Sequence, residues 1–128
     1  MLHSVHFSVE QAIKLIEELK PLVEEMTGLK KILDEKNYDI YRHEYFGGMG
    51  PNGTGAFPVE MERLIEIIKK IASSGVLIKN IDNGLIDFPH IRKNGEEVYL
   101  CWKLGENTLE YWHLIQGGFS GRKNLREL

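Results

Sequence analysis

Five polar or aromatic side chains in the last third of the chain could form one site: Asp87, Trp102, Tyr111, His113 and Arg122. A carboxylate and an imidazole can act together as a general base and its orienting group. The two aromatic side chains offer apolar surface with a polar tip, and an arginine can bind an anion. This combination indicates a site for a small molecule, in a binding protein or in an enzyme.

The placement of these residues depends on how the strands pair. Asn94-Gly95 is the typical sequence of a two-residue hairpin turn, which sets Asp87 opposite Trp102. A four-residue turn over 105–108 then sets Trp102 opposite Tyr111. Because side chains alternate between the faces of a sheet, we expect one face to carry Leu85, Asp87, Leu100, Trp102, Leu104, Tyr111 and His113.

In this register the backbones of Asp87 and His113 lie about 10–12 Å apart. We therefore expect a ligand or a water molecule between the two side chains, and no direct contact. A structural role is the alternative. Asp87 would then cap a turn or pair with Arg122, while Trp102 and Tyr111 would belong to the core.

The opposite face of the sheet brings Cys101 and His90 within reach of a shared metal ion. A zinc site needs four ligands, and the sequence has no C-x-x-C or H-x-x-x-H motif. We therefore expect no metal and no cofactor, and we interpret Cys101 as a buried structural thiol. His3, His6 and His43 fall outside any motif and are expected to be ordinary surface or partly packed residues.

A glycine-rich segment, residues 47–55, divides the chain. Its residues 48–53 match G-x-G-x-x-G, but a dinucleotide site needs a strand before this motif and a helix directly after it. Here a helix precedes it, so we interpret the segment as a linker.

Helical signals dominate before and after this linker. Ser8 and Gln11 form a capping box, and apolar residues then recur every three or four positions from Val9 onward. The spacing predicts a helix from 9 to about 45, kinked at Pro21 and weakened at Gly28. A second helix is predicted from Pro58 to the glycine at 75.

From residue 76 the apolar period changes to two, which predicts strands near 76–80, 85–92, 98–104 and 109–114. The fold class is therefore α+β: a long N-terminal helical hairpin over about 8–75, then a roughly four-stranded antiparallel meander over about 76–115. Residues 116–128 are expected to be an irregular tail. All 128 residues would form a single domain.

Several short strings of sequence resemble a known family. They are Asp87-Phe88-Pro89, Cys101-Trp102-Lys103-Leu104-Gly105-Glu106, Tyr111-Trp112-His113 and Gly118-Phe119-Ser120-Gly121-Arg122, with Phe7-Ser8-Val9-Glu10-Gln11-Ala12 and the glycine-rich segment before them. In order and spacing they resemble a prokaryotic family of domain of unknown function 2203. The resemblance covers nearly the whole chain. It implies a small soluble bacterial or archaeal protein, and it implies no reaction.

Composition excludes several classes of protein. The chain is 42% hydrophobic and 27% charged, with a net charge of −3, so it is globular and lacks the basic excess of a nucleic-acid binder. It has one cysteine and no apolar run of about 20 residues, and its first residues do not have the pattern of a signal peptide. We therefore expect a cytoplasmic protein with no nucleic-acid or membrane partner.

The unequal helices indicate self-association. A first helix of about 55 Å cannot be covered by a second of about 25 Å, and both faces of the sheet are apolar. The leading interpretation is thus a non-enzymatic protein that forms homo-oligomers. The alternative is a small-ligand-binding protein or an enzyme that uses Asp87, Trp102, Tyr111, His113 and Arg122. A metalloprotein using Cys101 and His90 is the third possibility.

Overall fold

Two helices and a five-stranded sheet make up the computed structural model, which describes residues 1–50 and 56–128. The helices are α1 (Val9–Glu35) and α2 (Val59–Ser73). The strands are β1 (Leu77–Asn80), β2 (Leu85–Ile91), β3 (Glu97–Lys103), β4 (Tyr111–Leu114) and β5 (Lys123–Asn124). The α+β class is confirmed. The glycine-rich linker falls partly on residues 51–55, outside the described residues.

The first helix begins where the sequence predicts and ends earlier. Ser8 and Gln11 form the predicted capping box, and the helix runs through Pro21 and Gly28 without a break. It stops at Glu35, not near residue 45, because Asn37 adopts a left-handed conformation (φ 57°). The chain then makes two short 3₁₀ turns, η1 (Ile40–Arg42) and η2 (Glu44–Phe46).

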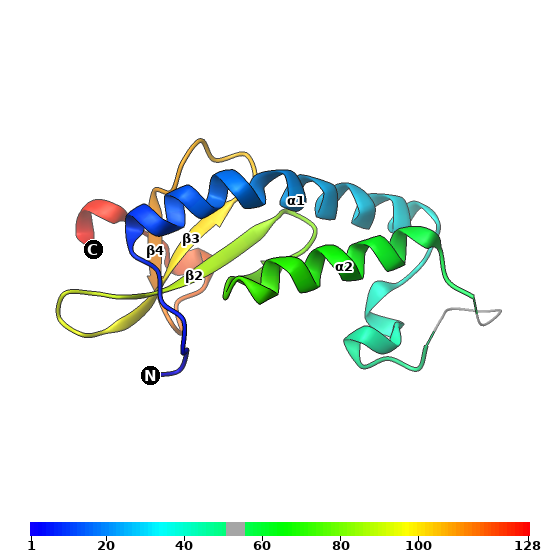
Figure 1. Cartoon of the computed structure of the whole chain (residues 1–128), viewed down its shortest axis with the longest axis horizontal. Coiled ribbons are helices and arrows are strands. Elements are labelled where there is room, and N and C mark those ends of the chain that lie inside the picture. Colours follow the sequence, from blue (N-terminus) through cyan, green and yellow to red (C-terminus); the bar gives the residue numbers. More distant parts are fainter. Residues whose placement is uncertain (51–55) are drawn as a thin grey trace.

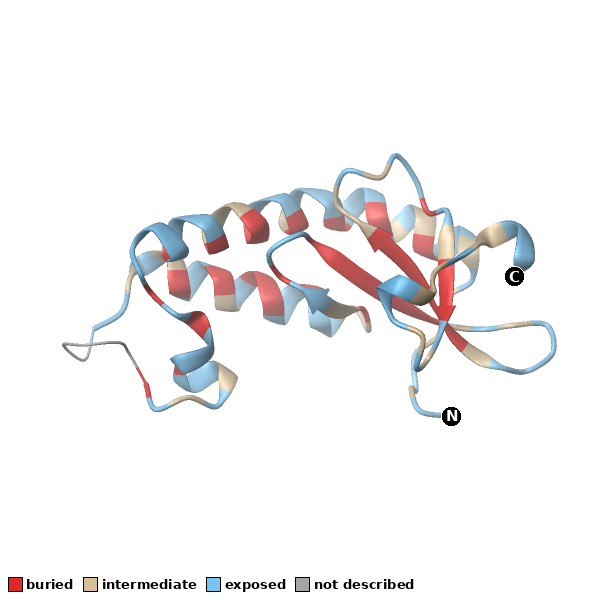
Figure 2. Cartoon of the chain, turned by 180° about the vertical axis from the view of Figure 1, so that it is seen from behind, coloured by how far each residue is buried: buried red, intermediate tan, exposed pale blue. Residues whose placement is uncertain are grey.

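The helices lie side by side at one end of the molecule, and the first half of α1 reaches over the sheet (Figure 1). Arg63 of α2 donates to both carboxylate oxygens of Glu25 on α1, at 2.7 and 2.9 Å. The sheet face toward α1 contributes to one core with the helices (Figure 2), through Ile86, Phe88, Val98, Leu100, Trp102 and Trp112.

The five strands follow one another in the order β1-β2-β3-β4-β5, and each antiparallel pair joins neighbours along the chain. The tail, expected to be irregular, supplies β5 and two further 3₁₀ turns, η3 (Phe119–Gly121) and η4 (Leu125–Glu127). No helix in the described part of the chain is long and apolar enough to cross a bilayer.

The predicted registers are each wrong by one residue. Asp87 pairs with Cys101, not with Trp102, and Cys101 pairs with Tyr111. The turn explains the first error. A two-residue Asn-Gly turn needs a positive φ at both residues, but of the two only Gly95 has one (φ 89°). The loop therefore spans three residues, and Arg92 and Glu96 close it with a backbone hydrogen bond of 2.9 Å.

Candidate functional site

Three neighbouring strands bring a carboxylate, a thiol and an imidazole together on the sheet face that points away from the core. Asp87 comes from β2, Cys101 from β3 and His113 from β4. One possible metal-ligating atom from each lies within 4.8 Å of the other two. The three residues are only 1%, 0% and 2% exposed. Within the described residues no other trio of such side chains comes this close.

His113 is held at both ring nitrogens. Its Nδ1 lies 2.7 Å from the carbonyl oxygen of Leu114, and its Nε2 lies 3.0 Å from Oδ2 of Asp87. A carbonyl oxygen can only accept a hydrogen bond, so Nδ1 carries a proton and Nε2 is directed at the carboxylate. Burial lowers the pKa of His113, whereas the hydrogen bonds to Asp87 and Leu114 raise it. The hydrogen bonds together outweigh burial, so the pKa lies above the ordinary value of a histidine.

Cys101 is a protonated thiol in this environment. Burial raises the pKa of Cys101, and the negative charge of Asp87 raises it further. A nucleophilic cysteine needs a lowered pKa and access to solvent, and Cys101 has neither. The expected buried cysteine on a strand is confirmed.

Asp87 has one carboxylate oxygen to spare. Its Oδ2 faces His113, whereas its buried Oδ1 has no well-aligned hydrogen-bond partner among the described residues. The thiol of Cys101 is the neighbouring donor, and besides burial a hydrogen bond to this carboxylate contributes to the raised pKa of the thiol. A buried oxygen without a partner costs free energy unless a ligand satisfies it. Oδ1 therefore marks this trio as a place where a further group could bind.

Tyr99 packs beside His113 on this sheet face, and His3 and Lys79 contact Tyr99 in turn. The ring of Tyr99 lies 5.5 Å from the imidazole of His113, centroid to centroid, and its hydroxyl lies 2.6 Å from Nε2 of His3. Lys79 holds its ammonium 4.7 Å from the Tyr99 ring centroid. The N-terminal residues 2–7, which we call the strap, thus place His3 against Tyr99. Glu97 fixes the start of the strap, because its carboxylate accepts from the backbone N–H groups of Leu2 and His3.

Arg122 closes the other side of the trio without contacting Asp87. Its guanidinium donates to both carboxylate oxygens of Glu106 at 2.7 Å and stacks on the ring of Tyr111 at 3.9 Å. It also donates to the carbonyl oxygen of Cys101 at 3.4 Å. Arg122 therefore anchors the tail beside the site, and Glu106 is the partner that sequence reasoning missed.

The structure unites some of the predicted site residues and separates others. Asp87, Tyr111 and His113 share one face, and Asp87 contacts His113 directly, which we did not expect. Trp102 lies on the opposite face in the core, where its Nε1 donates to the carbonyl oxygen of Glu106 at 3.1 Å. Side chains alternate between the two faces along a strand, and Trp102 pairs with Ile86, so Trp102 lies on the face opposite Asp87.

The suggested metal pair Cys101 and His90 is also wrong. His90 lies three residues after Asp87 on β2, so it points to the opposite face from Cys101. Its Nδ1 contacts the carbonyl oxygen of Phe7 at 2.7 Å. The histidine that lies beside the Cys101 thiol is His113 and not His90. Correct pairing of β3 in the sequence would have revealed this trio.

The trio is suited to a metal ion and not to nucleophilic catalysis. In a catalytic cysteine site the imidazole activates the thiol and is itself oriented by a third group. Here the imidazole instead directs its Nε2 at the carboxylate. Thiolate, imidazole and carboxylate are the three ligand types that proteins use for zinc.

A family model for uncharacterized conserved proteins, DUF2203, matches residues 6–125, so the chain belongs to this family. No curated protein and no solved structure matches the chain. The strings that resemble the family meet in space: Asp87, Cys101, Tyr111, His113, Glu106 and Arg122 all come from them.

Proposed function

We propose that this member of the DUF2203 family binds one divalent transition-metal ion, with zinc as the best match, through Asp87, Cys101 and His113. The observation that carries the proposal is the convergence of three different ligand types within 4.8 Å in a buried place. The unpartnered Oδ1 of Asp87 is the second support.

The hydrogen bond at the other ring nitrogen of His113 supports the same proposal. A histidine that ligates a metal usually donates its other N–H to a carbonyl or a carboxylate, which fixes the tautomer. His113 has this arrangement, because its Nδ1 donates to Leu114 and leaves Nε2 toward the other ligands. Tetrahedral zinc ligands lie roughly 3.3–3.8 Å apart. Nε2 of His113 and Oδ2 of Asp87 are already 3.0 Å apart, and the three ligand atoms lie within 4.8 Å, so only a small rearrangement would be needed around an ion.

Charge balance favours a divalent ion. A thiolate and a carboxylate together carry two negative charges, and a neutral imidazole adds none. A doubly charged cation makes the loaded site neutral, so burial of the whole group costs little. All three side chains are at most 2% exposed, and we propose metal binding as the function. The three residues leave one position of a tetrahedral zinc ion for a water molecule or another small ligand.

Metal titration of the purified chain tests this proposal. After dialysis against EDTA, we expect one equivalent of Zn²⁺ to bind in competition with a chromophoric chelator. We expect Co²⁺ in its place to give a thiolate-to-cobalt charge-transfer band. Cys101→Ser, Asp87→Asn and His113→Asn should each weaken binding by at least about 100-fold.

His90→Asn is the matched control, because His90 lies on the opposite face of the same sheet. It should bind zinc as the wild type does. Circular dichroism establishes that each variant is folded. Absence of zinc binding by the folded wild-type chain, or equal binding by Cys101→Ser, would contradict the proposal.

Self-association is a second proposal, now for a different reason. The first helix is shorter than predicted, and Tyr99 on the outer sheet face is already 3% exposed within one chain. However, four large apolar side chains near the turn of the helical hairpin are exposed: Tyr45, Met49, Phe57 and Val59. Surfaces of this kind often bind another protein surface.

Light scattering at micromolar concentration tests this second proposal. We expect a mass of at least twice the 14.7 kDa of one chain. Val59→Asp should reduce that mass, since Val59 is 71% exposed and its replacement disturbs no core contact. A wild-type mass equal to that of one chain would exclude self-association under these conditions.

A further inference from the structure

The outer edge of β1 is an unpaired strand edge. The strand order leaves β1 with a single neighbour, β2. Alternate residues of a strand turn their N–H and C=O groups to each side. Within residues 1–50 and 56–128, no backbone group outside the sheet bonds to Leu77–Asn80. This edge therefore offers hydrogen-bonding groups to another extended chain.

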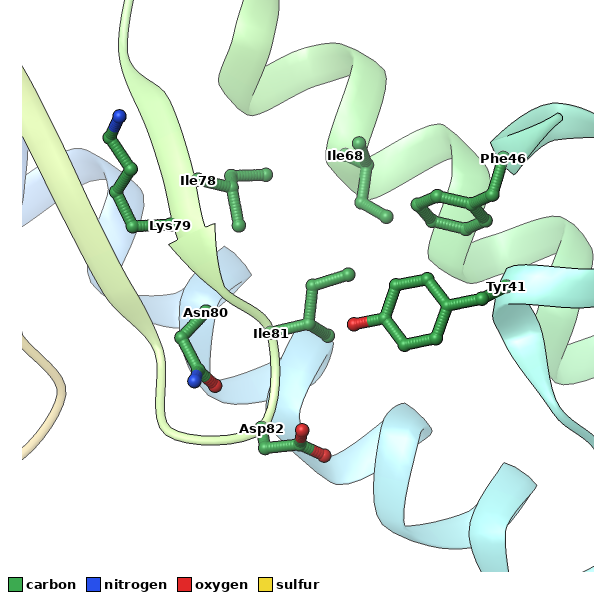
Figure 3. Close-up of a pocket in the computed structure, with 8 residues that line it drawn as sticks. All are labelled: Tyr41, Phe46, Ile68, Ile78, Lys79, Asn80, Ile81 and Asp82. Atoms are coloured by element: carbon green, nitrogen blue, oxygen red, sulfur yellow. The ribbon is translucent and has the colours of Figure 1, made fainter.

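Two cavities follow this edge. One, of about 300 Å³, lies between β1, α2 and the two 3₁₀ turns, and it is lined by Tyr41, Phe46, Ile68, Ile78 and Ile81 among others (Figure 3). The other, of about 490 Å³, continues past Ala72 and Leu77 toward His3. Ile68 and Ile78 line both cavities. Together they form one groove beside the free edge, which we call the β1 groove; apolar residues line it together with Lys79, Asn80 and Asp82 of the first cavity.

Positive charge flanks the β1 groove. Lys79 lines the first cavity and follows Ile78 on β1, so it lies on the other face of the strand. Lys69 follows Ile68 on α2 and lines neither cavity. Among the described residues neither lysine has an ion pair. Their ammonium groups instead lie over tyrosine rings, at 5.6 Å for Lys69 and 4.7 Å for Lys79. The nearby carboxylate of Asp82 is already bound by Lys30 at 2.9 Å.

We propose that the free edge of β1 is a docking site for an extended, acidic peptide segment of a partner protein. The segment would add a sixth strand and place apolar residues over Ile68 and Ile78. Its alternating carboxylates would then lie on the opposite sheet face, toward Lys79. Main-chain hydrogen bonds would give affinity, and the cavities and charges would give specificity. This proposal is independent of the metal site.

A second copy of the chain suits this edge less well. In an antiparallel pair of β1 strands centred on Lys79, the two copies of this lysine would face each other, and like charges directly opposite across a strand pair are destabilising. An acidic segment removes this repulsion and gains attraction. Charge therefore favours a different protein as the partner.

A labelled synthetic peptide tests the proposal. The probe is fluorescein-Glu-Val-Glu-Ile-Glu-Val-Glu-amide, titrated with the whole chain and followed by fluorescence anisotropy, with EDTA and with Zn²⁺. We expect saturable binding both in the presence of EDTA and in the presence of Zn²⁺. The same peptide with Lys for Glu should bind at least tenfold less tightly. So should the acidic peptide with alternate residues N-methylated, because methylation blocks one hydrogen-bonding edge.

Variants of the chain locate the binding surface. Lys79→Glu should weaken binding of the acidic peptide by about two- to fivefold, and Lys69→Glu, at a lysine that lines neither cavity, should change it less. Lys93→Glu, an exposed change in the β2–β3 hairpin, is the control and should leave binding unchanged. Amide hydrogen exchange of residues 77–80 should slow when the peptide is bound.

The opposite results overturn the proposal. Equal affinity for the acidic and lysine peptides, equal binding of the N-methylated peptide, or an unchanged affinity of Lys79→Glu would each do so. If amide exchange at residues 77–80 slows as the concentration of the chain alone rises, and the mass in solution becomes twice that of one chain, then a second copy occupies this edge instead.

Discussion

Asp87 and His113 reach across an intervening strand to form one hydrogen bond, 3.0 Å from Oδ2 to Nε2. β3 separates their strands, and its Cys101 lies directly opposite Asp87 in the sheet. The contact thus passes over the thiol and leaves the three groups beside one another. The first two predictions concern this arrangement in the metal-free chain.

Replacement of Asp87 should reveal what the carboxylate stabilises. Asp87→Ala leaves His113 buried with no acceptor opposite Nε2, and we expect a loss of about 2–4 kcal/mol in the free energy of unfolding. Asp87→Asn keeps an oxygen there and should cost about 1–2 kcal/mol. Urea denaturation in EDTA measures both. A gain in stability in either variant would mean that the metal-free carboxylate is strained.

The thiol of Cys101 should react slowly with a thiol reagent in the native chain. It is fully buried, and burial raises its pKa, so little thiolate is present. Denaturant should accelerate labelling, and Zn²⁺ should slow it further. We expect Cys101→Ser to cost about 1–3 kcal/mol. Rapid labelling of the native chain would contradict burial of this residue.

Acid should release the N-terminal strap through Glu97. The hydrogen bond to His6, aided by the backbone N–H groups of His3 and Leu2, lowers the pKa of Glu97 from 4.5 to about 2. A carboxyl with a lowered pKa in the folded state stabilises the fold fully above its unfolded value. That contribution is then lost as the pH falls from about 4.5 toward 2.

Thermal melting between pH 2 and 6 measures this effect. Glu97→Gln should be less stable than the wild type at pH 6, and the difference should shrink toward pH 2. Glu110→Gln is the control, because the exposed Glu110 side chain has no hydrogen-bond or ion-pair partner among the described residues. A constant difference across this range would contradict the role given to Glu97.

Two glycines should respond in opposite ways to alanine. Gly28 lies inside α1 with nothing within 4 Å of an added Cβ, so Gly28→Ala should stabilise by about 0.5–1 kcal/mol. Gly84 has φ +68° and would place a Cβ 2.7 Å from Val23 and 2.8 Å from Leu104. Gly84→Ala should therefore destabilise, by about 1–3 kcal/mol. Chemical denaturation compares the pair, and equal effects would contradict this.

Part of the site was predictable because two register errors cancel. One slip turns β3 over relative to β2, and the second turns β4 back relative to β3. Asp87 and His113 were therefore placed on the correct common face, while Trp102 stood where Cys101 belongs. Register depends on loop length, and the sequence Asn-Gly is compatible with loops of two or three residues.

Other features lay beyond the sequence pattern. The tyrosines after residue 37 keep helical spacing, but the left-handed Asn37 ends α1, and periodicity alone contains no signal for that. The capping box at Ser8 and the stop at Gly75 were predictable, because local hydrogen bonds and φ requirements determine them. The salt bridge from Arg122 to Glu106 depends on how the tail folds back over the sheet.

The meander order of the sheet has a consequence for how the chain folds. Every strand pairs with its neighbour in sequence, so the loops that must close are short and their entropic cost is small. By contrast, the strap must return across 95 residues to join Leu2 to Glu97, and Phe7 must return to pack on Phe88. We expect the sheet to assemble first. Asp87, Cys101 and His113 would then meet before the strap joins Glu97.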